Sequence, residues 1–276
     1  VAFAAGLTSG CAGILVGQPF DTVKVRLQTA PLGAYSGPLR CLRDTVHKEG
    51  VTALFKGLGP PLASAPIVNA IAFAAYVQAS KVSRVREPQL RLTTQEVFVA
   101  GAFAGACQTV VVLPTENIKT KLQVNTYARS TLKLQYKGAI DCATQLVRTQ
   151  GLRSLLAGGT ATVWREVPAY GIYFSVYEQV KALLKEKGAK EGVSAFAAGG
   201  IAGCSSWFAI APLDVIKSRQ QAMQDWRSKE ASSLVACARG MYREGGHRIF
   251  FRGLGTIMVR AFPVNAVIFP IYEVHH

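Results

Sequence analysis

The stretch PFDTVKVRLQ at residues 19–28 recurs twice, as PTENIKTKLQ at residues 114–123 and as PLDVIKSRQQ at residues 212–221. Each copy has proline, an acid two positions later, lysine three positions after the acid, then a base and a glutamine. The copies lie 95 and 98 residues apart, so the chain is an internal threefold repeat rather than a set of chance matches. We expect the three repeats at residues 1–92, 93–190 and 191–276.

Two further elements recur with the same period. About thirty residues after each proline come EGVTALFKG at residues 49–57, QGLRSLLAG at 150–158 and GGHRIFFRG at 245–253. In the apolar segments that follow, Asn69, Tyr170 and Asn265 occupy equivalent places. One module, used three times, therefore accounts for the whole chain.

The composition favours a membrane protein. Half of the residues are apolar, only 17% are charged, and the mean hydropathy is +0.22, whereas soluble domains carry about a quarter charged residues. The six cysteines form no CxxC pair and recur at repeated positions, so we expect small buried residues rather than disulfides or metal ligands.

The net charge of +15 would in a soluble protein first suggest nucleic acid. No glycine-rich phosphate loop, zinc-binding spacing or RNA-binding aromatic signature accompanies it. We therefore expect no nucleic-acid partner, no metal and no cofactor, and we expect the bases to face anionic lipid or an anionic solute. Because the four histidines do not combine with a nucleophile and an orienting group, we also expect no enzyme.

Six segments are long enough to cross a bilayer, since roughly twenty helical residues span its hydrocarbon core. Four are uncharged, at residues 1–20, 57–80, 97–115 and 192–213, and two carry charges in mid-span, at 158–180 and 253–274. The long linkers are basic and each contains an amphipathic segment. We expect an all-α membrane protein of six transmembrane helices in three tandem repeats with pseudo-threefold symmetry, plus short amphipathic helices.

The triple Pro-x-acid-x-x-base signature, with its glycine-ending partner, resembles that of the mitochondrial carrier family over essentially the whole chain. The resemblance implies a multi-pass transporter of the mitochondrial inner membrane. Its long linkers would lie in the matrix, and both chain ends would face the intermembrane space. It also implies a functional monomer that opens to one side at a time around a midplane site.

The charges beside the repeated prolines need partners, because an unpaired charge near hydrocarbon is costly. A threefold arrangement pairs them between neighbouring repeats: Asp21 with Lys119, Glu116 with Lys217, and Asp214 with Lys24. These residues resemble the family's matrix gate, with Gln28, Gln123 and Gln221 in the positions of its bracing glutamines. A purely structural role at the helix ends is the alternative.

The family's cytoplasmic gate is an aromatic-acid-x-x-base motif, from which this chain departs. The second repeat fits it with Tyr177, Glu178 and Lys181, and Tyr272 and Glu273 begin a third copy. The first repeat offers only the uncharged YVQAS at residues 76–80. We therefore expect a weak cytoplasmic gate.

Charges at membrane depth are functional candidates, and the chain has them at Arg165, Glu166 and Arg260. Aligning the repeats puts Ser64 at the same depth as the two arginines, and these positions resemble the family's substrate contact points. We expect further polar contacts from Asn69, Tyr170 and Asn265. Trp164 or Trp207 could cover an alkylammonium group, although packing against lipid or helices is the interpretation that the sequence favours.

An adjacent Arg165-Glu166 pair suits a zwitterion, with guanidinium to carboxylate and carboxylate to an amine. It resembles the amino-acid and carnitine branch of the family, which implies exchange of small zwitterionic metabolites, amino acids or carnitine and acylcarnitine, by alternating access. One alternative is a pair that merely neutralises itself. Another is an uncoupling-type proton or anion carrier that uses Glu166. The exact substrate and the choice between uniport and antiport stay open.

Cardiolipin is the lipid partner that the resemblance implies. Helices that begin after Gly57, Gly158 and Gly253 would present free backbone amides to a phosphate. The preceding residues, FKG at 55–57 and FRG at 251–253, resemble the family's lipid motifs.

Overall fold

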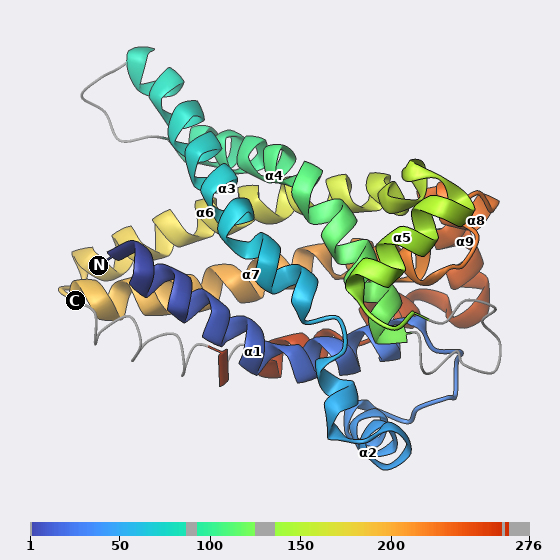
Figure 1. The fold of residues 1–276 in the computed structure, drawn as a ribbon. Coiled ribbons are helices and arrows are strands. Elements are labelled where there is room, and N and C mark those ends of the chain that lie inside the picture. Colours follow the sequence, from blue (N-terminus) through green and yellow to red (C-terminus); the bar gives the residue numbers. More distant parts are fainter. Residues whose placement is uncertain (1, 87–92, 125–135, 261–262, 265–276) are drawn as a thin grey trace.

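The computed structural model of the chain describes residues 2–86, 93–124, 136–260 and 263–264, with only the backbone described for residues 2–9 and 82–86. This part of the chain is helical and contains no strand. Five long helices form one bundle (Figure 1): α1 (Ala2–Thr29), α3 (Gly59–Arg86), α4 (Thr94–Val124), α6 (Gly159–Glu186) and α7 (Glu191–Ala222). The predicted all-α class is confirmed.

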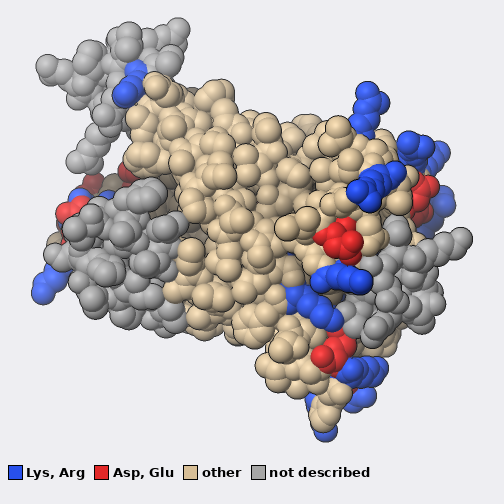
Figure 2. Space-filling model, viewed as in Figure 1, with Lys and Arg blue, Asp and Glu red and all other residues tan. Residues whose placement is uncertain are grey.

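The shortest of these helices has 28 residues, and at 1.5 Å per residue that is about 42 Å, longer than the hydrocarbon core. Three stretches combine this length with a strongly apolar composition, at Val51–Lys81, Thr94–Val124 and Glu191–Ala222. Residues 254–260 are also helical, but most of the expected segment 253–274 lies outside the described residues. The space-filling view shows an uncharged band across the middle of the molecule, with the charged side chains toward both ends (Figure 2).

Three short helices lie at the end of the bundle opposite the start of α1 (Figure 1). They are α2 (Pro38–Glu49), α5 (Ala139–Gln150) and α9 (Leu234–Gly245), followed by the 3₁₀ turns η1 (Val51–Phe55), η2 (Leu152–Leu156) and η3 (Gly246–Phe251); the one-turn helix α8 (Lys229–Ser232) precedes α9. The glycines between helix and turn, Gly50, Gly151 and Gly246, have φ of 82°, 80° and 62°, where only glycine is unstrained. The expected amphipathic segments are therefore helices.

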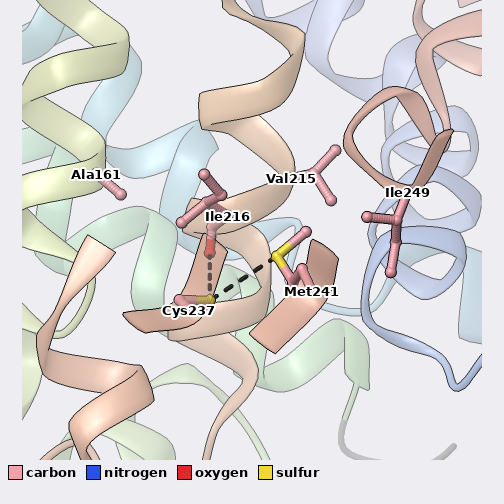
Figure 3. Close-up of a cluster of buried hydrophobic side chains, with 6 residues drawn as sticks. All are labelled: Ala161, Val215, Ile216, Cys237, Met241 and Ile249. Atoms are coloured by element: carbon pink, nitrogen blue, oxygen red, sulfur yellow. Dashed lines mark hydrogen bonds between the residues drawn. The ribbon is translucent and has the colours of Figure 1, made fainter. Parts of the chain in front are cut away.

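Each short helix is attached to the bundle through a buried cysteine. In the third repeat, Cys237 and Met241 of α9 pack on Val215 and Ile216 of α7, together with Ala161 and Ile249 (Figure 3). The Cys237 thiol contacts the carbonyl oxygen of Ile216 at 4.0 Å. Cys41 and Cys142 lie in the corresponding clusters of the first two repeats. All six cysteines are free. The expected burial holds for Cys41, Cys142 and Cys237, whereas Cys11 and Cys107 are half-buried and Cys204 is exposed.

These buried thiols should make stability fall at high pH. Burial raises the pKa of Cys41 and Cys237 to about 11 and that of Cys142 to about 12, from 9.0. The folded chain thus holds these protons more tightly than the unfolded chain, so the stabilisation is complete below pH 9 and is lost as pH rises toward 11. The melting temperature between pH 8 and 11 should fall more steeply for the wild type than for a variant with alanine at all three positions. Parallel curves would contradict this.

Glycines bring α4 and α6 into backbone contact. A Cβ atom at Gly101 would lie 2.7 Å from the Tyr170 carbonyl oxygen, and one at Gly105 would lie 2.7 Å from that of Glu166. A Cβ atom at Gly171 would likewise lie 2.7 Å from the ring of Phe98. Such small residues allow close helix packing in lipid, and here they fix the height of Glu166 relative to α4.

Replacing Gly105 with alanine should therefore destabilise the protein by about 1–3 kcal/mol, because the backbone of α6 must move. Gly203 of α7 is the matched control, since it is also inside a long helix but a Cβ atom there would meet no described atom within 4 Å. Alanine at Gly203 should be neutral or stabilise by up to about 1 kcal/mol. Equal melting temperatures for the two variants in lipid-supplemented detergent would contradict the packing argument.

Candidate functional site: a charged cavity above an ion-pair ring

Six charged side chains from α1, α4 and α7 form what we call the ion-pair ring. Lys119 Nζ lies 2.7 Å from Asp21 Oδ2, and Lys24 Nζ lies 2.7 Å from Asp214 Oδ2. Lys217 pairs with Glu116. These are the three pairings between repeats that the sequence predicts. The repeated prolines, Pro19, Pro114 and Pro212, lie inside α1, α4 and α7, and each helix continues through its proline.

Only one of the three glutamines braces the ring. Gln28 donates from Nε2 to Asp214 Oδ2 at 2.8 Å, beside Lys24. Gln123 instead donates to the Thr22 hydroxyl at 3.2 Å, and Gln221 accepts from the Thr120 hydroxyl at 3.1 Å. Gln123 and Gln221 thus bond to a threonine of the neighbouring helix rather than to a charged side chain of the ring, as bracing would require.

Arg165 of α6 reaches two carboxylates of the ring. Its Nη2 lies 2.9 Å from Glu116 Oε2, and its Nη1 lies 3.6 Å from Asp214 Oδ1. It also pairs with its neighbour Glu166. The side chain is only 7% exposed, so water screens its interaction with these acids less than it would at the surface. The pair Arg165-Glu166 therefore does more than neutralise itself.

Arg260, at the end of the helical segment 254–260, supplies the equivalent contact. Its Nε lies 3.0 Å from Asp21 Oδ1. A Cβ atom at Gly17, one turn before Asp21 on α1, would lie 2.7 Å from Arg260 Nε, so this glycine leaves the space through which the side chain passes. Each carboxylate of the ring consequently holds one lysine and one arginine.

A cavity of about 460 Å³ opens at the ring, within the roughly 300–1,000 Å³ of small-molecule sites. Five bases and four acids line it: Lys24, Lys119, Arg165, Lys217, Arg260, Asp21, Glu116, Glu166 and Asp214. Tyr170 and Trp207 contribute aromatic surface. Such a wall can bind both ends of a small zwitterion.

Two expected contacts from α3 are not found at the cavity. Pro61 and Val68 are the residues of α3 that line it. Ser64 Oγ instead donates to the Pro61 carbonyl oxygen at 3.5 Å. Asn69 is exposed, because it follows Val68 by one residue and a helix turns 100° per residue. Asn265 lies outside the described residues.

The two candidate tryptophans differ in position. Trp164 is 64% exposed, on the face of α6 away from the cavity. Trp207 of α7 has Lys24 Nζ 4.8 Å and Arg165 Cζ 6.0 Å from its ring centre. Cation-π attraction therefore operates within the cavity wall, and the covering of a substrate cation by Trp207 stays a prediction.

The opposite end of the bundle holds the predicted cytoplasmic-gate residues of α6. Lys181 lies 5.5 Å from the ring centre of Tyr177 and 3.9 Å from Glu191 of α7. Glu178 lines a second cavity, of about 630 Å³, between α3, α4 and α6. Tyr272 and Glu273 lie outside the described residues.

The glycines expected at lipid sites also pack against the ring. Gly57, Gly158 and Gly253 have φ of 78°, 71° and 81°. A Cβ atom at Gly57 would lie 2.9 Å from the Lys119 carbonyl oxygen, and one at Gly253 would lie 3.3 Å from Lys24 Cγ. Each therefore approaches the helix of the neighbouring repeat, a requirement that sequence reasoning missed.

Gln108 of α4 is a further cavity residue that the sequence reasoning missed. It is fully buried, and its Nε2 donates to Glu166 Oε2 at 3.1 Å. Its signal in the sequence is that it is the one amide side chain in the uncharged stretch 97–115.

Comparison with known proteins assigns the chain to one family. The sequence model of a family described as mitochondrial carrier protein matches residues 1–86, 91–188 and 189–276. A Bos taurus protein named mitochondrial basic amino acids transporter is 40% identical over 97% of this chain and 88% of its own length. A Mus musculus protein named solute carrier family 25 member 45 is 36% identical, over 98% and 96%. A Drosophila melanogaster protein named mitochondrial magnesium exporter 1 is 36% identical, over 97% and 90%.

Proposed function

Because the chain belongs to the mitochondrial carrier family, whose members are multi-pass transporters of the mitochondrial inner membrane, we propose that it exchanges basic amino acids across that membrane by alternating access. The observation that carries the proposal is the position of Arg165. It lies between the acid Glu166 in the cavity and the carboxylates of the ion-pair ring.

The charges of the cavity fit both ends of an amino acid. The guanidinium groups of Arg165 and Arg260 are bidentate donors suited to the α-carboxylate, and Glu166 suits an ammonium or guanidinium group. Trp207 adds a cation-binding surface. Amino acids are favoured over carnitine because a relative with 40% identity is named for basic amino acids.

The arginines also suggest how substrate binding opens the ring. Arg165 holds Glu116 and Asp214, and Arg260 holds Asp21. A substrate carboxylate competes with these acids for the same guanidinium groups. When an arginine turns to the substrate, the acids that it held keep only their lysines, so the ring weakens and separates. When the substrate leaves, the arginines return to the ring acids, so each acid again contacts two cations and the ring closes. Opening and closing of the ring around the substrate in this way constitutes one half of the exchange cycle.

Transport into liposomes that contain cardiolipin tests the proposal. Unlabelled arginine inside should accelerate the uptake of radiolabelled arginine and lysine, but not of carnitine, glutamate or glycine. Absence of exchange for every amino acid would overturn the proposal. Exchange of carnitine alone would assign the other zwitterion class, and fatty-acid-stimulated proton flux without exchange would assign an uncoupling-type carrier.

Four further features belong to the proposal. The functional unit is a monomer of three repeats, at residues 1–92, 93–190 and 191–276. Both chain ends face the intermembrane space, so the ion-pair ring faces the matrix. The residues of α6 at the opposite end, Tyr177, Glu178 and Lys181, act as the cytoplasmic gate. Cardiolipin binds the helix N-termini that follow Gly57, Gly158 and Gly253, where backbone amides suit a phosphate.

A further inference from the structure

Gln108 is a polar side chain in an otherwise apolar part of α4. It is 0% exposed and packs between helices, but it also lines the cavity. An amide away from water is costly unless its donors and acceptors are satisfied. The amide of Gln108 is therefore costly at this place in the cavity wall, and a role in binding would explain why it is there.

The orientation of the amide follows from its neighbour. Glu166 is an acceptor, so the Gln108 Nε2 must face it, and the distance to Glu166 Oε2 is 3.1 Å. The Oε1 atom then points elsewhere, and it has no hydrogen-bond partner among the described residues. Glu166 in turn has one oxygen engaged by Arg165 and the other by Gln108. An acceptor beside Glu166 would therefore add a hydrogen bond to a substrate cation that reaches this carboxylate.

We propose that Gln108 is a specificity-determining residue whose Oε1 accepts a hydrogen bond from the cationic side chain of the substrate, so that the site selects cations that carry N–H groups over quaternary amines. The inference rests on the proposed function and deepens it. A lysine ammonium or an arginine guanidinium has N–H donors for this oxygen. A trimethylammonium group carries the same charge but leaves the buried acceptor unsatisfied, and sites built for a hydrogen bond reject such analogues.

The packing of α4 on α6 supports the placement. Gly105 lies one turn before Gln108, and a Cβ atom there would lie 2.7 Å from the carbonyl oxygen of Glu166. The two backbones are thus in contact at this level, which holds the amide against the carboxylate. Helix-borne groups fixed in this way discriminate better than loop-borne ones.

Gln18 of α1 provides a matched control. It is equally buried at 0%, its Nε2 donates to the Lys56 carbonyl oxygen at 2.9 Å, and its Oε1 also lacks a partner among the described residues. It does not line the cavity. Gln123 also lines the cavity with an unpartnered Oε1, so neither that oxygen nor the position at the cavity is by itself a sign of binding. The hydrogen bond of Gln108 to the cavity acid Glu166 is what distinguishes it.

The test uses two probes that differ only in N–H groups, lysine and Nε-trimethyllysine. In liposomes with internal arginine, the wild type should prefer lysine, measured as KM for uptake and as inhibition of arginine uptake. Gln108→Leu should raise the KM for lysine about tenfold or more and leave that for trimethyllysine nearly unchanged. Gln18→Leu should reduce the amount of folded carrier but keep the wild-type ratio of the two constants.

Each outcome has a defined meaning. An unchanged ratio in Gln108→Leu overturns the inference alone. An equal loss for both probes also overturns it, because Gln108 then only positions Glu166. A wild type that exchanges arginine but does not distinguish the probes overturns it as well. A wild type that exchanges no amino acid overturns the proposed function, and with it this inference.

Discussion

Replacement of Arg165 with alanine is expected to reduce exchange on the order of a hundredfold or more, since losing a buried charged partner costs several kcal/mol. The guanidinium group holds Glu116 and Asp214 of the ring and pairs with Glu166 in the cavity. Without it the proposed substrate carboxylate lacks a partner, Glu116 and Asp214 keep only their lysines, and Glu166 loses its arginine. Initial rates of arginine counter-exchange in liposomes measure the loss.

Two further variants separate charge from geometry at this position. Arg165→Lys keeps the charge but cannot span two carboxylates, so its rate should lie between those of the wild type and the alanine variant. Trp164→Ala changes the adjacent residue, whose side chain is 64% exposed, and it should retain exchange. Wild-type rates in Arg165→Ala would show that the cavity binds its substrate elsewhere.

Removal of a ring carboxylate should cost more stability than removal of its lysine. Asp21→Asn leaves both Lys119 and Arg260 without their acid, whereas Lys119→Gln leaves Asp21 still paired with Arg260. Breaking a fully buried pair typically costs about 3–5 kcal/mol. Because the Asp21 side chain is 20% exposed, we expect Asp21→Asn at or below the lower end of that range and Lys119→Gln clearly below Asp21→Asn. Thermal unfolding in detergent with cardiolipin, at one pH and salt concentration, gives the comparison.

A surface pair calibrates this measurement. Arg40 lies 3.1 Å from Asp44 on α2, and its side chain is 62% exposed, so Arg40→Gln should change stability by less than about 1 kcal/mol. If Lys119→Gln destabilises the protein as much as Asp21→Asn, then Arg260 does not stabilise the ring. The contact between Arg260 and Asp21 would then not couple the cavity to the ring.

Repetition in the sequence determined the architecture. Three copies of one charged motif, about a hundred residues apart, require three equivalent environments, and a charge beside a membrane helix requires a partner. Those two constraints were enough to predict the bundle and the partners of Asp21, Glu116 and Asp214, because threefold symmetry leaves few ways to pair six charges. The buried cysteines of the short helices followed from the same repetition.

Tertiary structure decided what symmetry does not dictate. One departure from the repeat is that the glutamine braces the ring in one copy but not in the others, which depends on how far each side chain reaches. Another is that Asn69 is exposed while Val68 lines the cavity, because one residue step rotates the side chain around the helix. The links from Arg165 and Arg260 to the ring, and the approach of Gln108 to Glu166, join residues on different helices. The amino-acid pattern was thus sufficient to predict the repeat, the helices and the charge pairing. Packing selects the side chains that share the cavity, because glycines allow the close approach of helices and a linear pattern does not reveal the partners of those glycines.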